Sequence, residues 1–176
     1  MNSLELIALK DFPDVEPGNN IVELIINNIN TNNVSIDDFD VIVIAQKVIS
    51  KAENRYIDLD NINISDQAKK LALKLKKDKG LVQAIINESN KIISTEKNVI
   101  IVEHKLGFIN INAGIDQSNI PQADNLALLL PENPSKSAEV IQTNLSNQLN
   151  KKLSVIISDS MTRPVSYTHL TLPTKA

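Results

Sequence analysis

Short apolar runs that alternate with amphipathic stretches constrain the fold of this chain most strongly. Three of them, residues 41–45, 98–103 and 153–158, are rich in β-branched side chains and are bounded by polar residues. Short bounded runs of this kind are typical of buried strands. Two further strands are expected at residues 108–112, where apolar residues recur with a period of two, and at residues 126–130.

Between these runs, apolar residues recur with the spacing of amphipathic helices. A short helix is expected at residues 21–29. Ser65 is a candidate N-cap for a second helix, Gly80 is expected to end it, and another helix follows directly. Asn133 and Pro134 supply an N-cap and a preformed first residue for a helix whose apolar face holds Ala138, Ile141, Leu145 and Leu149. Strands alternating with helices predict a mixed α/β (α+β) architecture.

Composition excludes several classes of function. The chain has 176 residues, and because only 3% are aromatic, Ile, Leu and Val must fill the core. A net charge of -3 argues against nucleic-acid binding, which needs a basic excess. No apolar run approaches the roughly 20 residues that span a bilayer, so no membrane segment is expected. The absence of cysteine excludes disulfides and thiolate metal sites, and it fits a cytoplasmic location.

Two carboxylates occupy positions suited to metal binding. Asp159 directly follows a predicted strand, and Asp116 follows another strand through a turn that contains Gly114. Ligands of open α/β sheets gather beyond the carboxyl ends of strands, and carboxylate oxygens suit Mg²⁺ or Mn²⁺. The hydroxyl of Ser160 is a further candidate ligand. The alternative for each aspartate is an ordinary turn former or helix cap.

Lys47 and Lys51 follow the strand at residues 41–45, where their ammonium groups could contact phosphates. The alternative is that both lie on a solvated helix face. The sequence contains no glycine-rich phosphate loop of either common type. Its two histidines, His104 and His169, complete no Ser/His/Asp triad.

Six blocks of sequence, in order along the chain, resemble the coenzyme F-420-0:γ-L-glutamate ligase family. The most specific are Asn-Ala-Gly-Ile-Asp-Gln-Ser-Asn at 112–119 and Ser-Lys-Ala-Glu at 50–53. The blocks as a whole lie at residues 9–13 together with 17–18, and at 46–53, 86–89, 112–119, 128–131 and 155–160.

This resemblance implies a family-specific ligase fold and a GTP-dependent reaction. A carboxylate of the coenzyme F-420 precursor, a deazaflavin, would be phosphorylated by GTP. The amine of L-glutamate would then attack the acyl phosphate to form an amide, with γ-linkages for later glutamates. The implied cofactor is Mg²⁺ or Mn²⁺, with K⁺ as a further candidate, and the implied assembly is a homodimer.

The resemblance also implies roles for individual residues. Asp116 and Asp159 match ligands of one divalent metal, and Ser160 matches a residue near a second metal. The matched nucleotide contacts are Phe12, Pro13, Asp14, Val15, Gln46, Lys47, Lys51 and Asn119.

The sequence departs from the family pattern near its end, where Thr162 stands in place of a glycine. We therefore expect a ligase-like region at residues 1–164 and a non-native or disordered tail at residues 165–176. Family members continue beyond this point, so the chain is expected to be inactive by itself. Two other hypotheses stay open, a related ligase acting on another carboxylate and a non-catalytic module that binds nucleotide or metal.

Overall fold

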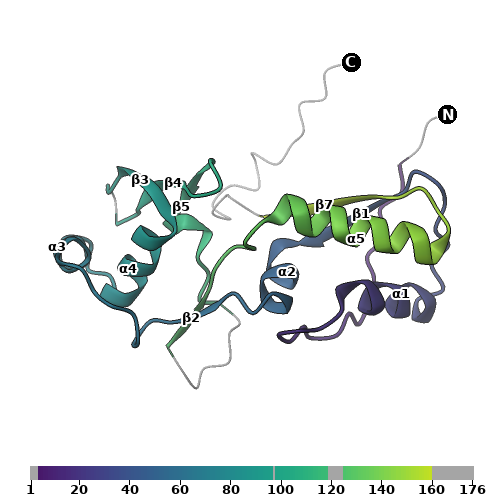
Figure 1. Ribbon diagram of the computed structural model, residues 1–176, viewed down its shortest axis with the longest axis horizontal. Helices are drawn as coiled ribbons and strands as arrows, with labels where there is room; N and C mark the ends of the chain where they lie inside the picture. Colours follow the sequence, from purple (N-terminus) through teal and green to yellow (C-terminus); the bar gives the residue numbers. More distant parts are fainter. Residues whose placement is uncertain (1–3, 97, 119–124, 160–176) are drawn as a thin grey trace, which may run out of the picture.

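The computed structural model describes residues 4–96, 98–118 and 125–159. The molecule is elongated, with a lobe at each end of its long axis (Figure 1). The first lobe contains α1 (Ile21–Thr31), β1 (Val41–Ala45), α2 (Gln46–Ala52), α5 (Pro134–Leu149) and β7 (Ser154–Ser158). The second contains α3 (Asp66–Leu75), α4 (Lys79–Asn87), β3 (Ser89–Ser94), β4 (Ile101–His104) and β5 (Ile109–Ile111). The predicted mixture of helices and strands is confirmed.

A parallel pair of strands organises the first lobe. β1 and β7 run side by side in register from Val41 opposite Ser154 to Ala45 opposite Ser158. Helices α1 and α5 pack on this pair, and the apolar core between them is built from aliphatic side chains, as the low aromatic content predicted. Its buried members are Val15, Ile21, Val22, Ile25, Ile29, Ile44, Ile49, Ile141, Leu145 and Leu153.

The expectation that β1 and β7 are buried strands is confirmed for one face of the pair and wrong for the other. Val41 and Val43 are 51% and 60% exposed, whereas Ile44 is buried. Ile156 of β7 is exposed as well. Because successive strand residues point to opposite faces, the helices cover only one face of this pair.

The second lobe has its own core. Strands β3, β4 and β5 form an antiparallel sheet in that order, and α3 and α4 pack against it. The buried members of this core are Ala68, Ala72, Leu75, Val82, Ile85, Ile100, Val102 and Ala113. A short antiparallel pair, β2 (Tyr56–Asp58) with β6 (Leu126–Leu128), runs between the lobes and packs on α4 through Leu59, Ala84 and Ala127.

The predicted helix starts are confirmed, but one helix end is wrong. Ser65 caps α3 by accepting from the backbone N–H of Ala68, and Asn133 caps α5 by accepting from that of Lys136. Gly80 does not end α3. Lys76 ends that helix in the left-handed conformation, and Gly80 is the second residue of α4. A Cβ at Gly80 would clash with the carbonyl oxygen of Leu59, so glycine is needed there for close packing.

Strand positions in the second lobe differ from expectation in detail. β4 begins at Ile101 rather than at residue 98, and β2 and β3 were not predicted. In β5 the alternation holds, but Asn110 faces the interior with 5% exposure while Ile109 is 57% exposed. Polarity alone therefore assigns the wrong face of β5 to the core.

Candidate functional site

The candidate site lies where β1 passes directly into α2. Because β1 and β7 are parallel and Ala45 lies opposite Ser158, the residues that follow them, Gln46 and Asp159, emerge at the same sheet edge. This is the edge at which ligands gather in open α/β sheets. The predicted placement of Asp159 just after a strand is confirmed.

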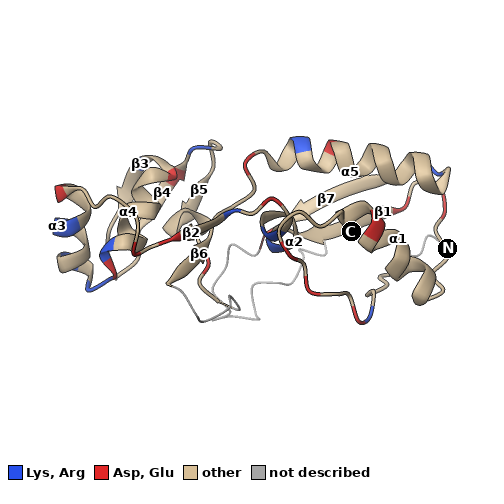
Figure 2. Cartoon of the chain, turned by 60° about the horizontal axis from the view of Figure 1, so that its bottom comes forward, with Lys and Arg blue, Asp and Glu red and all other residues tan. Residues whose placement is uncertain are grey.

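Lys47, in the first turn of α2, joins this edge to Asp116. Its ammonium group forms an ion pair with the Asp116 carboxylate and also donates to Ser118 Oγ at 3.2 Å. The backbone N–H of Ser118 donates to Asp116 Oδ1 at 2.7 Å. Figure 2 shows α2, which carries basic residues, between the two lobes. The structure thus brings together residues predicted separately as a phosphate contact and a metal ligand.

A tight turn and a backbone bridge hold Asp116 in position. The turn is a 3-10 helix at Asn112–Gly114, in which all three residues have positive φ, 49°, 54° and 67°. Asp116 then exchanges both backbone hydrogen bonds with Leu128, at 3.0 and 2.8 Å. Since the backbone is fixed on both sides of Asp116, the position and direction of its side chain are well defined.

The surroundings of Asp116 keep it ionised. Burial raises the pKa of its carboxyl, but the Lys47 ammonium and the Ser118 N–H outweigh burial and lower the pKa below the ordinary 3.8. The side chains of Lys47 and Asp116 keep 30% and 28% of their surface exposed, so solvent reaches the pair. An ionised, partly accessible carboxylate is the form that binds a divalent cation.

Gln46 and Lys51 lie on the same short helix. Gln46 is buried, and its Oε1 accepts from Ser50 Oγ at 2.9 Å. Lys51 follows Lys47 by one helical turn, which places both on one side of α2. The two lysines predicted to contact phosphate are therefore neighbours. The Gln46 side chain is buried and lines a separate pocket.

The predicted nucleotide segment at residues 12–15 is partly built into the core. Val15 is buried in the core of the first lobe and Phe12 packs against it, whereas Pro13 and Asp14 are exposed. Just beyond, the backbone N–H of Gly18 donates to the carbonyl of Ala52, which ties the segment to the end of α2. Pro13 and Asp14 are the side chains of this segment that a ligand could reach.

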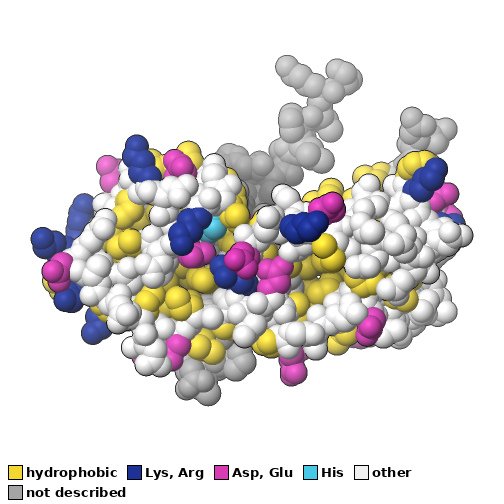
Figure 3. Space-filling model, in the orientation of Figure 1, with side chains coloured by type: hydrophobic (Ala, Val, Ile, Leu, Met, Phe, Trp, Pro, Cys, Tyr) yellow, Lys and Arg dark blue, Asp and Glu magenta, His cyan; other side chains and the backbone are white. Residues whose placement is uncertain are grey.

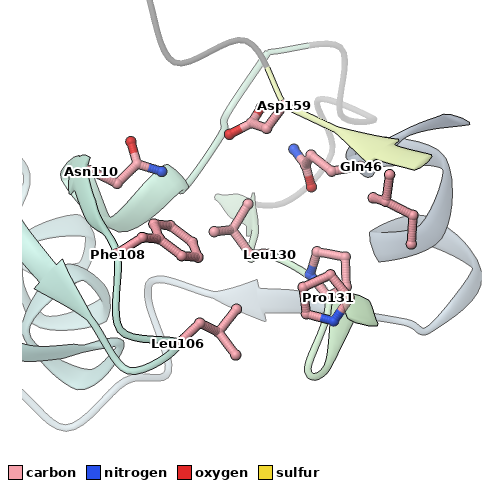
Figure 4. Close-up of a pocket in the computed structure, with 9 residues that line it drawn as sticks. Gln46, Leu106, Phe108, Asn110, Leu130, Pro131 and Asp159 are labelled. Atoms are coloured by element: carbon pink, nitrogen blue, oxygen red, sulfur yellow. The ribbon is translucent and has the colours of Figure 1, made fainter. Parts of the chain in front are cut away.

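A pocket of about 220 Å³ adjoins the start of α2 (Figure 4). Gln46 and Asp159 lie at one end, and Asn110 and Phe108 lie at the other. Most of the remaining lining is aliphatic or proline. The carboxylate of Asp159 and the amide of Asn110 both point toward the space above Phe108 and Leu130.

A cluster of charged residues centred on Glu88 lies behind this pocket. The Glu88 carboxylate is 3.3 Å from the Arg55 guanidinium and 3.5 Å from the Lys105 ammonium. Arg55 also donates to the carbonyl of Leu130 at 2.9 Å, which couples the cluster to the pocket wall. In Figure 3 basic and acidic side chains gather at the middle of the molecule, with hydrophobic side chains on either side.

His104 is buried beside this cluster. Burial lowers the pKa of its imidazole below the ordinary 6.5, although Glu88 opposes the shift. Its Nδ1 accepts from the backbone N–H of Leu106 at 3.0 Å, which places the proton of the neutral ring on Nε2. His104 is therefore a neutral structural residue. It is the last residue of β4, as expected for a residue at a strand end, but it is buried and not at the surface.

Two of the predicted site residues, Asn119 and Ser160, lie outside the described residues, as does the segment at residues 165–176. Among the residues that the structure describes, no three His, Asp or Glu side chains are grouped to hold a metal. The predicted ligands among the described residues are the carboxylates of Asp116 and Asp159, and the Ser118 hydroxyl lies beside Asp116. These are hard ligands that fit Mg²⁺ or Mn²⁺ in kind.

Ser118 and Asn110 were not predicted from the sequence as site residues. Ser118 belongs to the specific block at 112–119, and its position two residues after Asp116 is typical of an Asx turn. No sequence signal indicated Asn110, because asparagine is abundant in this chain and polar residues in strands are usually exposed.

Comparison with known proteins assigns the chain to a family. The model of the F420-0:gamma-glutamyl ligase family matches residues 10–173. The chain belongs to this family. A relative from Methanothermobacter thermautotrophicus, named coenzyme F420:L-glutamate ligase, is 41% identical over 161 residues, which cover 92% of this chain and 63% of the relative.

Two further relatives carry the same name. One from Methanocaldococcus jannaschii is 45% identical over 129 residues, covering 73% of this chain and 51% of the relative. One from Haloarcula marismortui is 34% identical over 167 residues, covering 92% and 62%. The chain thus spans between about half and just under two thirds of the length of these ligases. The family resemblance inferred from the six blocks is confirmed.

Within the part of the chain that the structure describes, none of the helices combines the length and apolar character needed to cross a membrane.

Proposed function

We propose that this chain carries part of the metal and nucleotide site of a GTP-dependent ligase that joins L-glutamate to the coenzyme F-420 precursor. The observation that carries the proposal is the ion pair between Lys47 and Asp116 at the sheet edge where Asp159 also emerges. Membership of the F420-0:gamma-glutamyl ligase family and the names of the relatives support the choice of substrates.

The proposed reaction has two steps. An oxygen of the precursor carboxylate attacks the γ-phosphorus of GTP, and the bond to the β-phosphate oxygen breaks to release GDP. The nitrogen of glutamate then attacks the acyl phosphate, loses a proton and expels inorganic phosphate as the amide forms. Both steps bring anionic groups together, so catalysis depends mainly on positive charge and alignment.

Asp116 and Asp159 would hold the divalent cation, which would neutralise phosphate charge when bound. Lys47 and Lys51 supply positive charge from one side of α2 and are suited to phosphate oxygens. In the structure the Lys47 ammonium is paired with Asp116. A nucleotide with its cation would give both partners stronger counter-charges, so we expect this ion pair to open when they bind.

Nucleotide binding tests the site directly. GTP binding in the presence of Mn²⁺ is measured by calorimetry for the native chain, Asp116→Ala and Asp66→Ala. Asp66 makes a matched control because it also pairs with a lysine, Lys69, but on α3. We expect Asp116→Ala to lose most of the affinity and the control to keep it. Equal binding by all three proteins would refute the metal role of Asp116.

Turnover tests the reaction itself. GTP, L-glutamate and a panel of carboxylate acceptors are incubated with the chain, and amide products are measured by mass spectrometry. Product from another acceptor alone would favour the related-ligase hypothesis. GTP binding without any product would agree both with the non-catalytic module and with the expected inactivity of this chain by itself. The homodimer and the K⁺ requirement stay predictions, which sedimentation and ion replacement respectively test.

A further inference from the structure

The pocket beside α2 has the character of a binding site for an uncharged ring. Its lining is mostly apolar and includes Leu106, Phe108, Leu130, Pro131, Pro134 and Ile157. No lysine or arginine is among its described lining residues, so nothing there matches a phosphate group. An apolar pocket with a few directed polar groups is the usual form of a small-molecule site.

Asn110 supplies an unused hydrogen-bond donor to this pocket. Its side chain is 95% buried, since only 5% is exposed, and its Oδ1 accepts from the backbone N–H of Ile111 at 2.6 Å. Its Nδ2 has no acceptor among the described residues. In Figure 4 this nitrogen points toward the pocket interior. Buried donors are almost always paired in native proteins, so an unpaired one directed at a pocket indicates a ligand acceptor.

Gly114 makes room for this donor. A Cβ at Gly114 would lie 2.9 Å from Asn110 Nδ2 and 2.8 Å from Leu130 Cδ1. The glycine of the block at 112–119 is therefore needed for the amide and the pocket wall to occupy their places, in addition to its positive φ.

Phe108 forms a fixed aromatic surface in the pocket. Its ring stacks on His104 with the centroids 5.1 Å apart and the planes 3° from parallel. His104 is itself held by the N–H of Leu106, so one face of the phenyl ring rests on a buried side chain. A rigid aromatic surface favours a flat aromatic ligand, which can stack or make edge contacts with it.

We propose that this pocket binds a planar fused-ring heteroaromatic group whose carbonyl oxygen accepts a hydrogen bond from Asn110 Nδ2. The assignment of this group to the acceptor substrate rests on the proposed function. A deazaflavin ring matches this description, because the carbonyl oxygens of its pyrimidine ring are attached to an extended aromatic body. A purine base, polar around its whole edge, would leave several polar groups unpaired against these walls. The side chain of the acceptor molecule would extend from the ring past Gln46 and Asp159, toward the phosphate site.

Binding of the isolated ring tests this proposal without the ligation reaction. The full chain is titrated with 8-hydroxy-5-deazariboflavin, followed by the fluorescence of the ring, with no nucleotide, glutamate or metal present. Asn110→Leu removes the donor, and Phe108→Leu removes the aromatic surface while keeping the pocket apolar. Phe39→Leu is the matched control, because Phe39 is 77% exposed and lies outside this pocket.

We expect the ring to bind and each pocket variant to bind about tenfold more weakly, since each loses one directed contact. The control should bind like the native chain, and guanosine should not displace the ring. Failure of the ring to bind, unchanged binding by both pocket variants, or displacement by guanosine would overturn the proposal. The guanosine result does not depend on the folding of any variant.

The two proposals fail separately. Loss of GTP binding without loss of ring binding would reject the nucleotide site and keep the pocket. The reverse result would reject the pocket and keep the nucleotide site.

Discussion

The ammonium group of Lys47 and the carboxylate of Asp116 form an ion pair across the boundary between the two lobes. Lys47 extends from α2, whose Ile49 is part of the first core, whereas Asp116 follows Ile115, which packs on the second. Ser118 adds a hydrogen bond to the same ammonium. The pair therefore connects the two lobes at the place where chemistry is proposed.

Lys47→Met should weaken GTP binding more than it weakens the fold. The ion pair is partly exposed, and such pairs contribute at most about 1 kcal/mol to stability. We expect nucleotide affinity in the presence of Mn²⁺ to fall about tenfold, which corresponds to about 1.4 kcal/mol. Lys69→Met, which breaks the exposed pair with Asp66, serves as the control for calorimetry and thermal unfolding. A change in unfolding with unaltered nucleotide binding would contradict the predicted role.

The stability contributed by Asp116 should disappear in acid. The folded state lowers the pKa of this carboxyl below 3.8, so its contribution is present above that pH and is lost as the pH falls through the folded pKa. Asp116→Asn should therefore be less stable than the native chain near neutral pH, and the difference should close below about pH 3.8. Urea unfolding at a series of pH values measures the difference, and a constant gap would contradict this account.

His104 should make the fold sensitive to mild acid. The folded state lowers its pKa below 6.5, mainly through burial, so stability is full above pH 6.5 and falls as the pH drops through the folded pKa. Glu88, Lys105 and Arg55 are the charged groups beside it. His104→Asn can keep an acceptor for the Leu106 N–H without a titrating ring. Its urea midpoint should change less between about pH 7 and pH 5 than that of the native chain.

Gly114→Ala and Gly107→Ala should separate crowding from backbone strain. Both glycines have positive φ, 67° and 88°, but only a Cβ at Gly114 would meet other atoms, with Leu130 Cδ1 at 2.8 Å. We expect about 1 kcal/mol of destabilisation at Gly107 from the backbone alone. At Gly114 we expect about 1–3 kcal/mol more from overpacking. Equal urea midpoints for the two variants would show that Leu130 and Asn110 move aside at no cost, which would contradict the predicted overpacking.

Local sequence patterns predicted the helices and strands of this fold better than they predicted which face of each strand is buried. The Asn-Pro pair before α5 and Ser65 before α3 identified helix starts, because a cap is satisfied within its own turn. The end of α3 was predicted at Gly80, but Lys76 ends the helix in the left-handed conformation. Gly80 instead packs closely against the backbone of Leu59. Neither constraint is visible without the tertiary structure.

The candidate site was predicted residue by residue but not as an arrangement. Strand ends and family resemblance predicted Asp116, Asp159 and Lys47 as candidates, and their roles stay predictions. Their proximity depends on the parallel register of β1 with β7 and on the bridge between Asp116 and Leu128. Pairing between strands distant in sequence leaves no local pattern, so neither the ion pair nor the unpaired amide of Asn110 could be foreseen.

The separate cores of the two lobes have a kinetic consequence. Each lobe buries its own aliphatic residues, while Lys47 and Asp116 belong to different lobes. Partial unfolding of either lobe would break the pair even while the other stays folded. The lifetime of the assembled site is then limited by whichever lobe opens more often, and amide hydrogen exchange, read lobe by lobe, would identify it.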